Sequence, residues 1–466
     1  MNRVSIALFI IIGLVCEQLY GYESYIPTYF PDTSEEGMGL PLFLTPYIHA
    51  GDVETAQELA LVQHPKMDFF TSYSGFLTVD KQYNSNLFFW YVKAQENSDE
   101  APVIIWLAGG PGFTTFYAFF YENGPFYLTP ELDFPPREYS WHIDHNIIFI
   151  DNPVGTGFSF TESEEGYSTN SEHVAVNLYE ALQQFFTLFP HLRSNSFFIC
   201  AESFGAQYAA FLGPLIHERN ADRPKEEFIN LRGISIGNGA INFGEQMTDP
   251  AFLYQLGFID AKTAESVALE EEYIHSLARN GDYKEAGRGI LNLFIANDSK
   301  VKEATGLDEL YNFVTAQDDI YVPMLKFLSD VSIRKAIHVG GVGFYGVENN
   351  PAESHLYHLL AFPVTDKISE ILSYYPLLLY SGQLDLEITY SSMEKILRKL
   401  DFKDCDEYLT ARRHSWRVDG TVAGYVKQGG LLTEVLVRNS GHMAPLEQPK
   451  WCLNLILKLT YEKAFV

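Results

Sequence analysis

Six short apolar runs, spread along most of the 466-residue chain, constrain the fold more than any other feature of this sequence. They occupy residues 103–107, 146–150, 196–200, 234–236, 377–380 and 434–437. Segments with helical periodicity, such as 174–186, separate several of these runs. Continuously apolar strands that alternate with helices are typical of a mostly parallel sheet buried on both faces. The sequence therefore predicts an α/β protein.

The pattern changes between residues 240 and 365, where helical periodicity and glycine-rich breaks replace the strand signals. We therefore expect one sheet domain in two parts, residues 22–239 and 366–466, with a helical insertion between them. The first part begins with a proline-rich arm that is helical at 52–62. The strand patterns at 74–79 and 87–93 predict an antiparallel pair after it.

Residues 1–21 have the pattern of a secretory signal peptide. Arg3 supplies the positive charge, and the apolar stretch from Val4 to Val15 is too short to span a bilayer. No later stretch predicts a membrane helix, so we expect a secreted or lysosomal protein. The formal net charge of −28 disfavours nucleic acid and anionic membranes as partners, because both repel an acidic surface.

Three cysteines remain once the signal segment with Cys16 is removed. Cys200 ends an apolar run and is expected to be a small buried hydrophobic residue. Cys405 and Cys452 could pair, but their spacing does not decide it. No cluster of cysteine, histidine and acidic residues has metal-ligand spacing, so no metal and no cofactor are expected.

Three junctions between an apolar run and a loop contain reactive side chains: Ser203, Asp385 and His442. Ser203 lies in the sequence Ala201-Glu202-Ser203-Phe204-Gly205, which follows one run and precedes a helical segment, as in a nucleophile elbow. The order serine, aspartate, histidine is that of the α/β-hydrolase catalytic triad. Loops at the carboxyl ends of parallel strands meet at one edge of a sheet, so we expect the three side chains to converge.

A glycine-rich loop follows another run, at Ala108-Gly109-Gly110-Pro111-Gly112. Glycines there allow backbone N–H groups to approach a substrate oxygen, and with the N–H of Phe204 they would form an oxyanion hole. A G-x-G-x-x-G sequence at 341–346 has a different context, because it follows a helical stretch instead of a strand. A dinucleotide site is therefore not expected there.

The segments 41–48 and 73–79, with motifs at 106–112, 122–125, 151–160, 202–205 and 441–445, resemble the serine carboxypeptidases of the carboxypeptidase Y and cathepsin A type. The first two segments are most similar to the vitellogenic-like branch of that family. The matching motifs are Trp106–Gly112 (W-L-N-G-G-P-G), Glu122–Pro125 (E-N-G-P), Asp151–Phe160 (D-x-P-V-G-x-G-F-S-Y), Glu202–Gly205 (E-S-Y-[AG]) and Gly441–Pro445 (G-H-M-V-P). The resemblance runs from about residue 41 to the end of the chain.

This resemblance implies an α/β-hydrolase fold with a helical cap, and removal of C-terminal residues from peptides at acidic pH. It assigns Ser203 as nucleophile, His442 as general base and Asp385 as its orienting acid, with the N–H groups of Gly110 and Phe204 as the oxyanion hole. It also implies that the substrate carboxylate is bound by Gly109, Glu122 and Glu202. Glutamates can bind a carboxylate only when protonated, so their pKa must be raised.

Two departures from the family pattern fall in this region. Ala108 replaces the asparagine that would donate to the substrate carboxylate, and Phe113 replaces a cysteine that would anchor the loop through a disulfide. Ala201, Thr114, Thr115 and Ala206 are smaller deviations nearby. We therefore expect an intact triad with a weakened clamp on the substrate.

The function predicted is a serine-type carboxypeptidase that acts on peptide or protein C-termini through an acyl-enzyme. One alternative is an acyltransferase or esterase that uses the same triad. Another is a catalytically weak secreted homologue retained for peptide binding. A homodimer is left open, and the sequon at Asn297 predicts a glycosylation site in the insertion.

Overall fold

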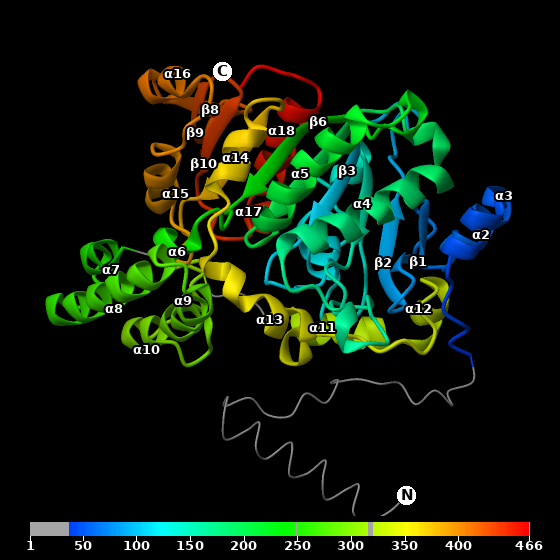
Figure 1. Cartoon of the computed structure of the whole chain (residues 1–466), viewed down its shortest axis with the longest axis horizontal. Coiled ribbons are helices and arrows are strands. Elements are labelled where there is room, and N and C mark those ends of the chain that lie inside the picture. Colours follow the sequence, from blue (N-terminus) through cyan, green and yellow to red (C-terminus); the bar gives the residue numbers. More distant parts are fainter. Residues whose placement is uncertain (1–36, 248, 316–319, 466) are drawn as a thin grey trace, which may run out of the picture.

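The computed structural model describes residues 37–247, 249–315 and 320–465. The predicted signal peptide, 1–21, lies outside these residues. A ten-stranded sheet with the order β1-β2-β4-β3-β5-β6-β7-β10-β9-β8 forms the centre of the molecule (Figure 1). Its strands are β1 (Ser72–Asp80), β2 (Ser85–Val92), β3 (Val103–Leu107), β4 (Asn146–Ile150), β5 (Phe197–Glu202), β6 (Leu231–Gly237), β7 (Leu377–Gly382), β8 (His414–Val418), β9 (Thr421–Gly429) and β10 (Leu432–Val437).

The six strands in the middle of this order are parallel to one another: β4, β3, β5, β6, β7 and β10. They are the six apolar runs, so the predicted parallel sheet is confirmed. The predicted antiparallel pair is also confirmed as β1 and β2. The antiparallel hairpin of β8 and β9 was not predicted, because its strands carry several exposed side chains and so lack a continuous apolar run.

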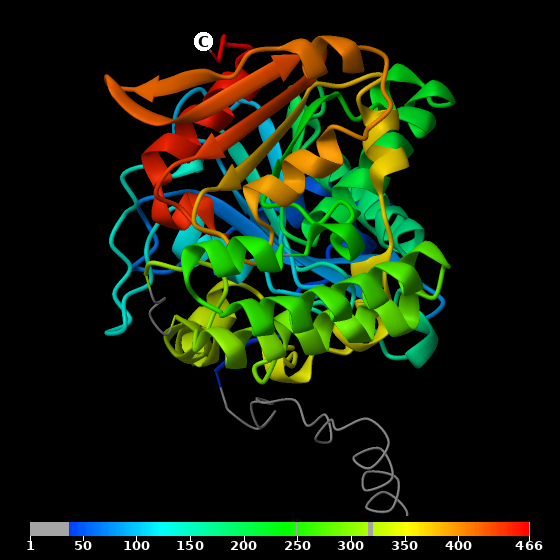
Figure 2. The same ribbon diagram turned by 90° about the vertical axis from the view of Figure 1, so that its left-hand side faces the viewer.

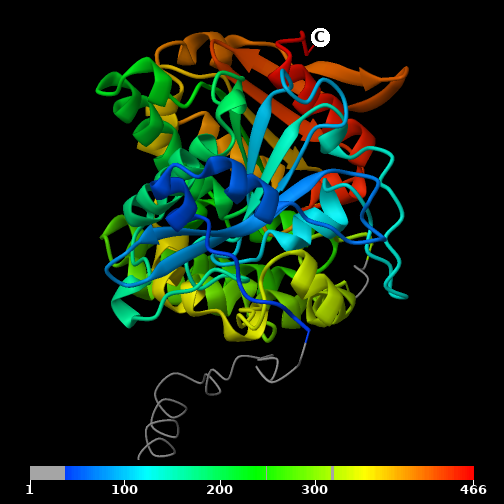
Figure 3. The same cartoon turned by 90° about the vertical axis from the view of Figure 1, so that its right-hand side faces the viewer.

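Helices cover both faces of the sheet. One core cluster packs α2 (Thr45–Ala50), α3 (Val53–Ala60), α4 (Ser171–Leu188), α5 (Gly205–Ala221), α14 (Thr365–Ile371) and α15 (Tyr390–Leu397) against one face. The other cluster packs α11 (Tyr321–Ser329), α12 (Val331–Ala336), α17 (Ala444–Glu447) and α18 (Pro449–Thr460) against the opposite face. Figure 3 shows the blue helices α2 and α3 beside the β1–β2 edge, which they contact. None of the helices in the described ranges is long and apolar enough to cross a membrane.

The chain between β6 and β7 is largely helical. It forms α6 (Phe243–Gln246), α7 (Pro250–Leu256), α8 (Ala261–Arg279), α9 (Tyr283–Ile290), α10 (Lys300–Thr305), α11, α12, α13 (Pro351–Leu356) and α14. Figures 1 and 2 show α7 to α10 gathered at one side of the sheet domain. The G-x-G-x-x-G sequence at 341–346 follows α12 and not a strand, so its context is not that of a dinucleotide site.

All three described cysteines are free. Cys200 and Cys452 are buried in the core on one face of the sheet, whereas Cys405, at the start of α16 (Cys405–Thr410), packs against the core on the other face. The sheet therefore separates Cys405 from Cys452, and the disulfide that their spacing left open does not form.

Candidate active site

The predicted site residues lie in loops at the carboxyl edge of the parallel strands. Ser203 follows β5 at the centre of the sheet, and the glycine-rich loop follows the neighbouring strand β3. On the other side of β5, Asp385 follows β7 and His442 follows β10. Two strands, β8 and β9, separate β7 from β10 along the chain, but β10 is the spatial neighbour of β7.

Ser203 occupies the apex of a tight turn between β5 and α5. Its φ of 55° lies in the left-handed region, which is uncommon for a serine and typical of a nucleophile elbow. A Cβ at Gly205 would lie 2.3 Å from the carbonyl oxygen of Leu107, and a Cβ at Gly109 would lie 2.7 Å from the Cβ of Ser203. Glycine is therefore required at both positions for the strands and the loop to approach the serine.

His442 and Asp385 form a buried pair, with 2.8 Å between the imidazole Nδ1 and the carboxylate Oδ2. Asp385 also accepts bonds from the backbone N–H groups of Glu387 (2.7 Å) and Ile388 (3.1 Å). The Asn238 side chain donates a further bond of 2.7 Å to Oδ2. No hydrogen bond joins the Ser203 hydroxyl to His442 within the described ranges, although catalytic hydrogen bonds are often long in structures without substrate.

Asn238 is a site residue that the sequence analysis missed. It follows β6, between the strands that carry Ser203 and Asp385, and its φ of 41° is positive. Its amide oxygen accepts a bond from the N–H of Gly382, at the end of β7. Asn238 could have been predicted from its position just after the apolar run 234–236, because the carboxyl end of that strand lies at the same edge of the sheet.

Several charges act on the His442 imidazole. Burial lowers its pKa, but Asp385 outweighs this through its charge and hydrogen bond, and Glu387 and Glu122 add to the effect, so that the pKa is raised to about 9. Burial raises the pKa of Glu387 and of Glu122 to about 7. Below pH 7 these two carboxyls become neutral and no longer raise the pKa of His442.

The backbone N–H groups of Gly110 and Phe204, both near Ser203, have no backbone acceptor in the part of the chain that the structure describes. Gly110 has a φ of 111°, and a Cβ there would lie 2.6 Å from the N of Gly112. Only glycine can adopt this conformation, so the sequence of the loop fixes the position of this N–H group.

Side chains from two other segments anchor the glycine-rich loop. Asn350, at the start of α13, donates to the carbonyl oxygens of Pro111 (3.2 Å) and Gly112 (2.8 Å). Asp151, after β4, accepts from the Thr114 hydroxyl (2.7 Å) and the Thr115 N–H (3.0 Å). These contacts hold the loop although Phe113 excludes the disulfide of the family pattern. No sequence signal pointed to Asn350.

Glu122 and Glu202 form a buried carboxyl pair next to the elbow. The two side chains share a hydrogen bond and are only 3% and 6% exposed. Burial raises the pKa of Glu202 well above its ordinary value, and the nearby Glu122 raises it further. Burial likewise raises the pKa of Glu122 to about 7, against the opposing effects of the Glu202 hydrogen bond and the buried Arg137. The pair therefore retains a proton in mildly acidic solution.

Other predicted positions are also described. Ala108 directly follows β3 and has no side-chain donor, so nothing at this position replaces the asparagine of the family pattern. Asn297 lies on the surface, between α9 and α10, while the hydroxyl of Ser299 is buried and bonded to the carbonyl of Phe294. Glycosylation at Asn297 stays a prediction.

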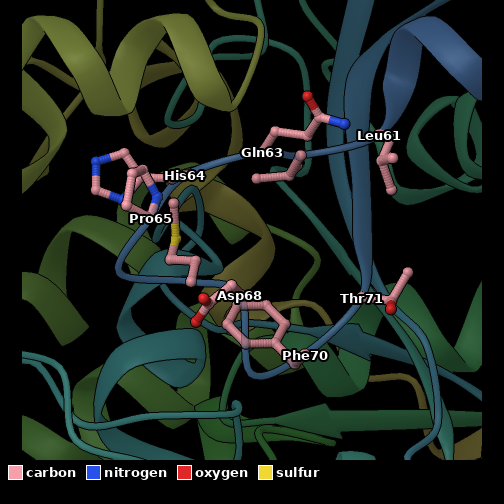
Figure 4. A pocket seen from close by; sticks show the side chains of 9 residues that line it. Leu61, Gln63, His64, Pro65, Asp68, Phe70 and Thr71 are labelled. Atoms are coloured by element: carbon pink, nitrogen blue, oxygen red, sulfur yellow. The ribbon is translucent and has the colours of Figure 1, made fainter.

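A separate cavity of about 440 Å³ lies in the loop between α3 and β1. Figure 4 shows its lining, which comes from residues 61–71 of this one loop. None of the predicted catalytic or carboxylate-binding residues lines it. The cavity is therefore separate from the candidate active site at the strand edge.

Comparison with known proteins shows which family the chain resembles. The family model described as serine carboxypeptidase matches residues 63–461. The chain is 43% identical to the vitellogenic carboxypeptidase of Aedes aegypti, over 91% of this chain and 90% of that protein, and 41% identical to the venom serine carboxypeptidase of Apis mellifera, over 94% and 95%. It is 36% identical to the probable serine carboxypeptidase CPVL of Homo sapiens, over 100% and 98%. The crystal structure of KEX1(delta)p, a prohormone-processing carboxypeptidase from Saccharomyces cerevisiae, superimposes with a TM-score of 0.70 at 21% identity, covering 87% of this chain and 95% of that one, and confirms the predicted α/β-hydrolase fold.

Proposed function

The chain belongs to the serine carboxypeptidase family of hydrolases, and from this premise we propose that it cleaves the last peptide bond of peptides or proteins through an acyl-enzyme on Ser203. The observation that carries the proposal is the buried 2.8 Å pair of His442 and Asp385 at the same sheet edge as the Ser203 elbow. An elbow serine and a buried His–Asp pair are the parts that nucleophilic acyl transfer requires.

In the proposed reaction, Ser203 Oγ bonds to the scissile carbonyl carbon as its proton passes to His442 Nε2. Asp385 holds the imidazole by Nδ1 and stabilises its charge. The N–H groups of Gly110 and Phe204, which have no backbone acceptor within the described residues, would bind the oxyanion. Breaking the C–N bond releases the C-terminal residue, which takes the proton from His442. Water activated by His442 then cleaves the ester and restores Ser203.

The Glu122–Glu202 pair supports a preference for a free terminal carboxylate. While the pair retains its proton it can donate a hydrogen bond to the carboxylate, with the Gly109 N–H as a further donor. Once both carboxyls ionise, they repel the substrate. Acid also neutralises Glu122 and Glu387 beside His442, which lowers the pKa of that base, while Asp385, the larger cause of its raised pKa, stays in place and makes His442 set the acid limit of activity. We therefore propose that activity is highest in acidic solution.

Ala108 weakens this clamp, because one donor to the substrate carboxylate is missing. It is the observation that keeps esterase or acyl-transfer activity open as a second function. The relatives named vitellogenic and venom carboxypeptidases are in keeping with a secreted or lysosomal location, which we propose for this chain.

The test combines labelling with three substrates. An organophosphate should modify Ser203 in the folded protein, and no modification would contradict the enzymatic proposal. Hydrolysis of a blocked dipeptide, its amide and its ester is then compared from about pH 4.5 to 7.5. Preference for the free carboxylate, lost as pH rises, supports a carboxypeptidase. Preference for the ester at all pH values indicates an esterase, and labelling without turnover indicates a binding protein.

A further inference from the structure

The segment between α10 and α11 brings an aromatic ring onto the imidazole of His442. The ring of Tyr311 stacks on that imidazole, with 4.8 Å between the ring centroids and 14° between the planes. Tyr311 belongs to the largely helical chain between β6 and β7, whereas His442 lies in the loop after β10. Neither the order of the motifs nor the sheet topology predicts this contact.

Backbone hydrogen bonds hold the Tyr311 segment between the two loops of the His–Asp pair. The N–H of His442 donates to the carbonyl oxygen of Tyr311 (2.7 Å). On the other side, the N–H of Leu386 donates to Leu310 (2.9 Å) and the N–H of Phe313 donates to Leu384 (3.1 Å). The segment thus bridges the loops that carry His442 and Asp385.

A side-chain contact and a close backbone approach at a glycine also hold the Tyr311 segment against the His442 loop. The Glu447 carboxylate accepts from the Asn312 side chain (2.5 Å) and from the N–H of Gly441 (3.0 Å). A Cβ at Gly441 would lie 2.0 Å from the carbonyl oxygen of Tyr311. The backbone at Tyr311 is therefore held against the backbone of the His442 loop.

From this geometry we infer that Tyr311 is a positioning residue for His442. Its ring keeps the imidazole in the orientation in which it hydrogen-bonds to Asp385, and it stabilises the protonated form of the imidazole. The face of an aromatic ring carries negative charge, so a stacked ring attracts an imidazolium more strongly than an imidazole. The imidazolium forms when His442 accepts the proton of Ser203. Only the proton transfer from Ser203 rests on the proposed function. The stacking of Tyr311 on His442, and its effect on the pKa of His442, do not depend on it.

The test replaces Tyr311 by leucine, which has no ring, and by phenylalanine, which keeps the ring and removes only the hydroxyl. With a blocked dipeptide, we expect the Tyr311→Leu variant to lose about five- to thirtyfold in kcat with KM little changed, and the Tyr311→Phe variant to resemble the parent. The acid limb of kcat/KM should move to lower pH in Tyr311→Leu, because the protonated base loses its stacked ring. The other titratable groups around His442 are Asp385, Glu387, Glu122 and Glu447, and all are unchanged in both variants.

Incorporation of pentafluorophenylalanine at position 311 separates electrostatics from packing, since it keeps the ring but reverses its charge distribution. We expect this variant to behave like Tyr311→Leu, and it remains informative if the leucine variant does not fold. An NMR titration of the His442 imidazole needs no substrate. The pKa of His442 should be lower in the leucine and fluorinated variants than in the parent and the phenylalanine variant, and this comparison can be made even if peptidase activity is absent. Equal imidazole titrations in the parent, phenylalanine and fluorinated proteins would overturn the inference.

Discussion

The charges around Ser203 depend on the protonation of buried groups that influence one another's pKa. Glu122 and Glu202 retain a proton because burial penalises their charged forms, and the two carboxyls repel each other when both ionise. His442 is stabilised as a cation by Asp385, Glu387 and Glu122. One drop in pH therefore acts on the substrate clamp and on the general base together.

The Glu202→Gln variant tests the clamp. A glutamine donates hydrogen bonds at every pH, so KM for a peptide with a free carboxylate should rise less steeply between pH 5 and 8 than in the parent. The measurement is KM against pH. Glu226→Gln, an exposed change in a short helical turn, is the matched control and should reproduce the parent curve. Parallel curves for Glu202→Gln and the parent would contradict a titrating clamp.

The Ala108→Asn variant tests the missing donor. An added hydrogen bond to a carboxylate contributes about 1.5–3 kcal/mol, so KM for a free-carboxylate peptide should fall by about tenfold or more. The corresponding peptide amide should show no such gain. If the variant and the parent bind the free-carboxylate peptide equally, position 108 does not face the substrate.

At the scale of elements, the loop after β3 depends on contacts from segments far away in the sequence. Asn350 from the start of α13 and Asp151 from the end of β4 hold it, and Gly110 gives it a conformation that other residues avoid. The helical chain between β6 and β7 thus reaches the site twice, through Asn350 and through Tyr311.

Changing Asn350 should affect catalysis more than folding. Asn350→Asp retains the oxygen that caps α13 through the N–H of Glu353, but it loses the two bonds to the loop. We expect kcat to fall about 10- to 100-fold, since Gly110 then loses its fixed position, with little change in KM. Asn170→Ala removes a comparable cap from α4 and should lower the free energy of unfolding by about 1 kcal/mol without changing kcat. Equal kcat values in Asn350→Asp and the parent would show that the loop is anchored without Asn350.

For the molecule as a whole, buried carboxyls other than the catalytic Asp385 and the Glu122–Glu202 pair make folding stability depend on pH. Burial raises the pKa of Asp151 and Glu353 to about 7, and that of Glu271, on α8, to about 8. A carboxyl with a raised pKa binds more protons in the folded state than in the unfolded state. Its contribution to stability is therefore complete at low pH and is lost as pH rises through the folded value.

We accordingly expect the melting temperature to increase as the pH is lowered from 8 to 5. Burial lowers the pKa of seven described histidines, in His142 and His145 to about 4, and these groups oppose the trend below about pH 6.5, so the increase should be clearest between pH 8 and about 6.5. The melting temperature of Glu271→Gln should depend less on pH than that of the parent. A melting temperature that rises towards pH 8 would contradict this account.

Much of this fold can be read from the chain because its strands are buried on both faces. A strand such as β3 or β5 must be apolar throughout, which makes it visible as a run, and the residue after it must lie at the sheet edge. This is why Ser203, Asp385 and His442 could be predicted as partners from the sequence. The β8–β9 hairpin was not predicted because both strands, at one end of the sheet, expose several side chains and so keep no such run.

The sequence by itself determined the parallel sheet, the elbow at Ser203 and the order of the three reactive side chains, since each depends on local pattern and strand direction. Only the tertiary structure decided that Asn238 supports Asp385, that Asn350 and Asp151 replace a disulfide, and that Tyr311 stacks on His442. It also decided that Cys405 and Cys452 stay apart on opposite faces of the sheet. These are contacts between segments distant along the chain, and one residue's type does not specify which distant side chain will reach it.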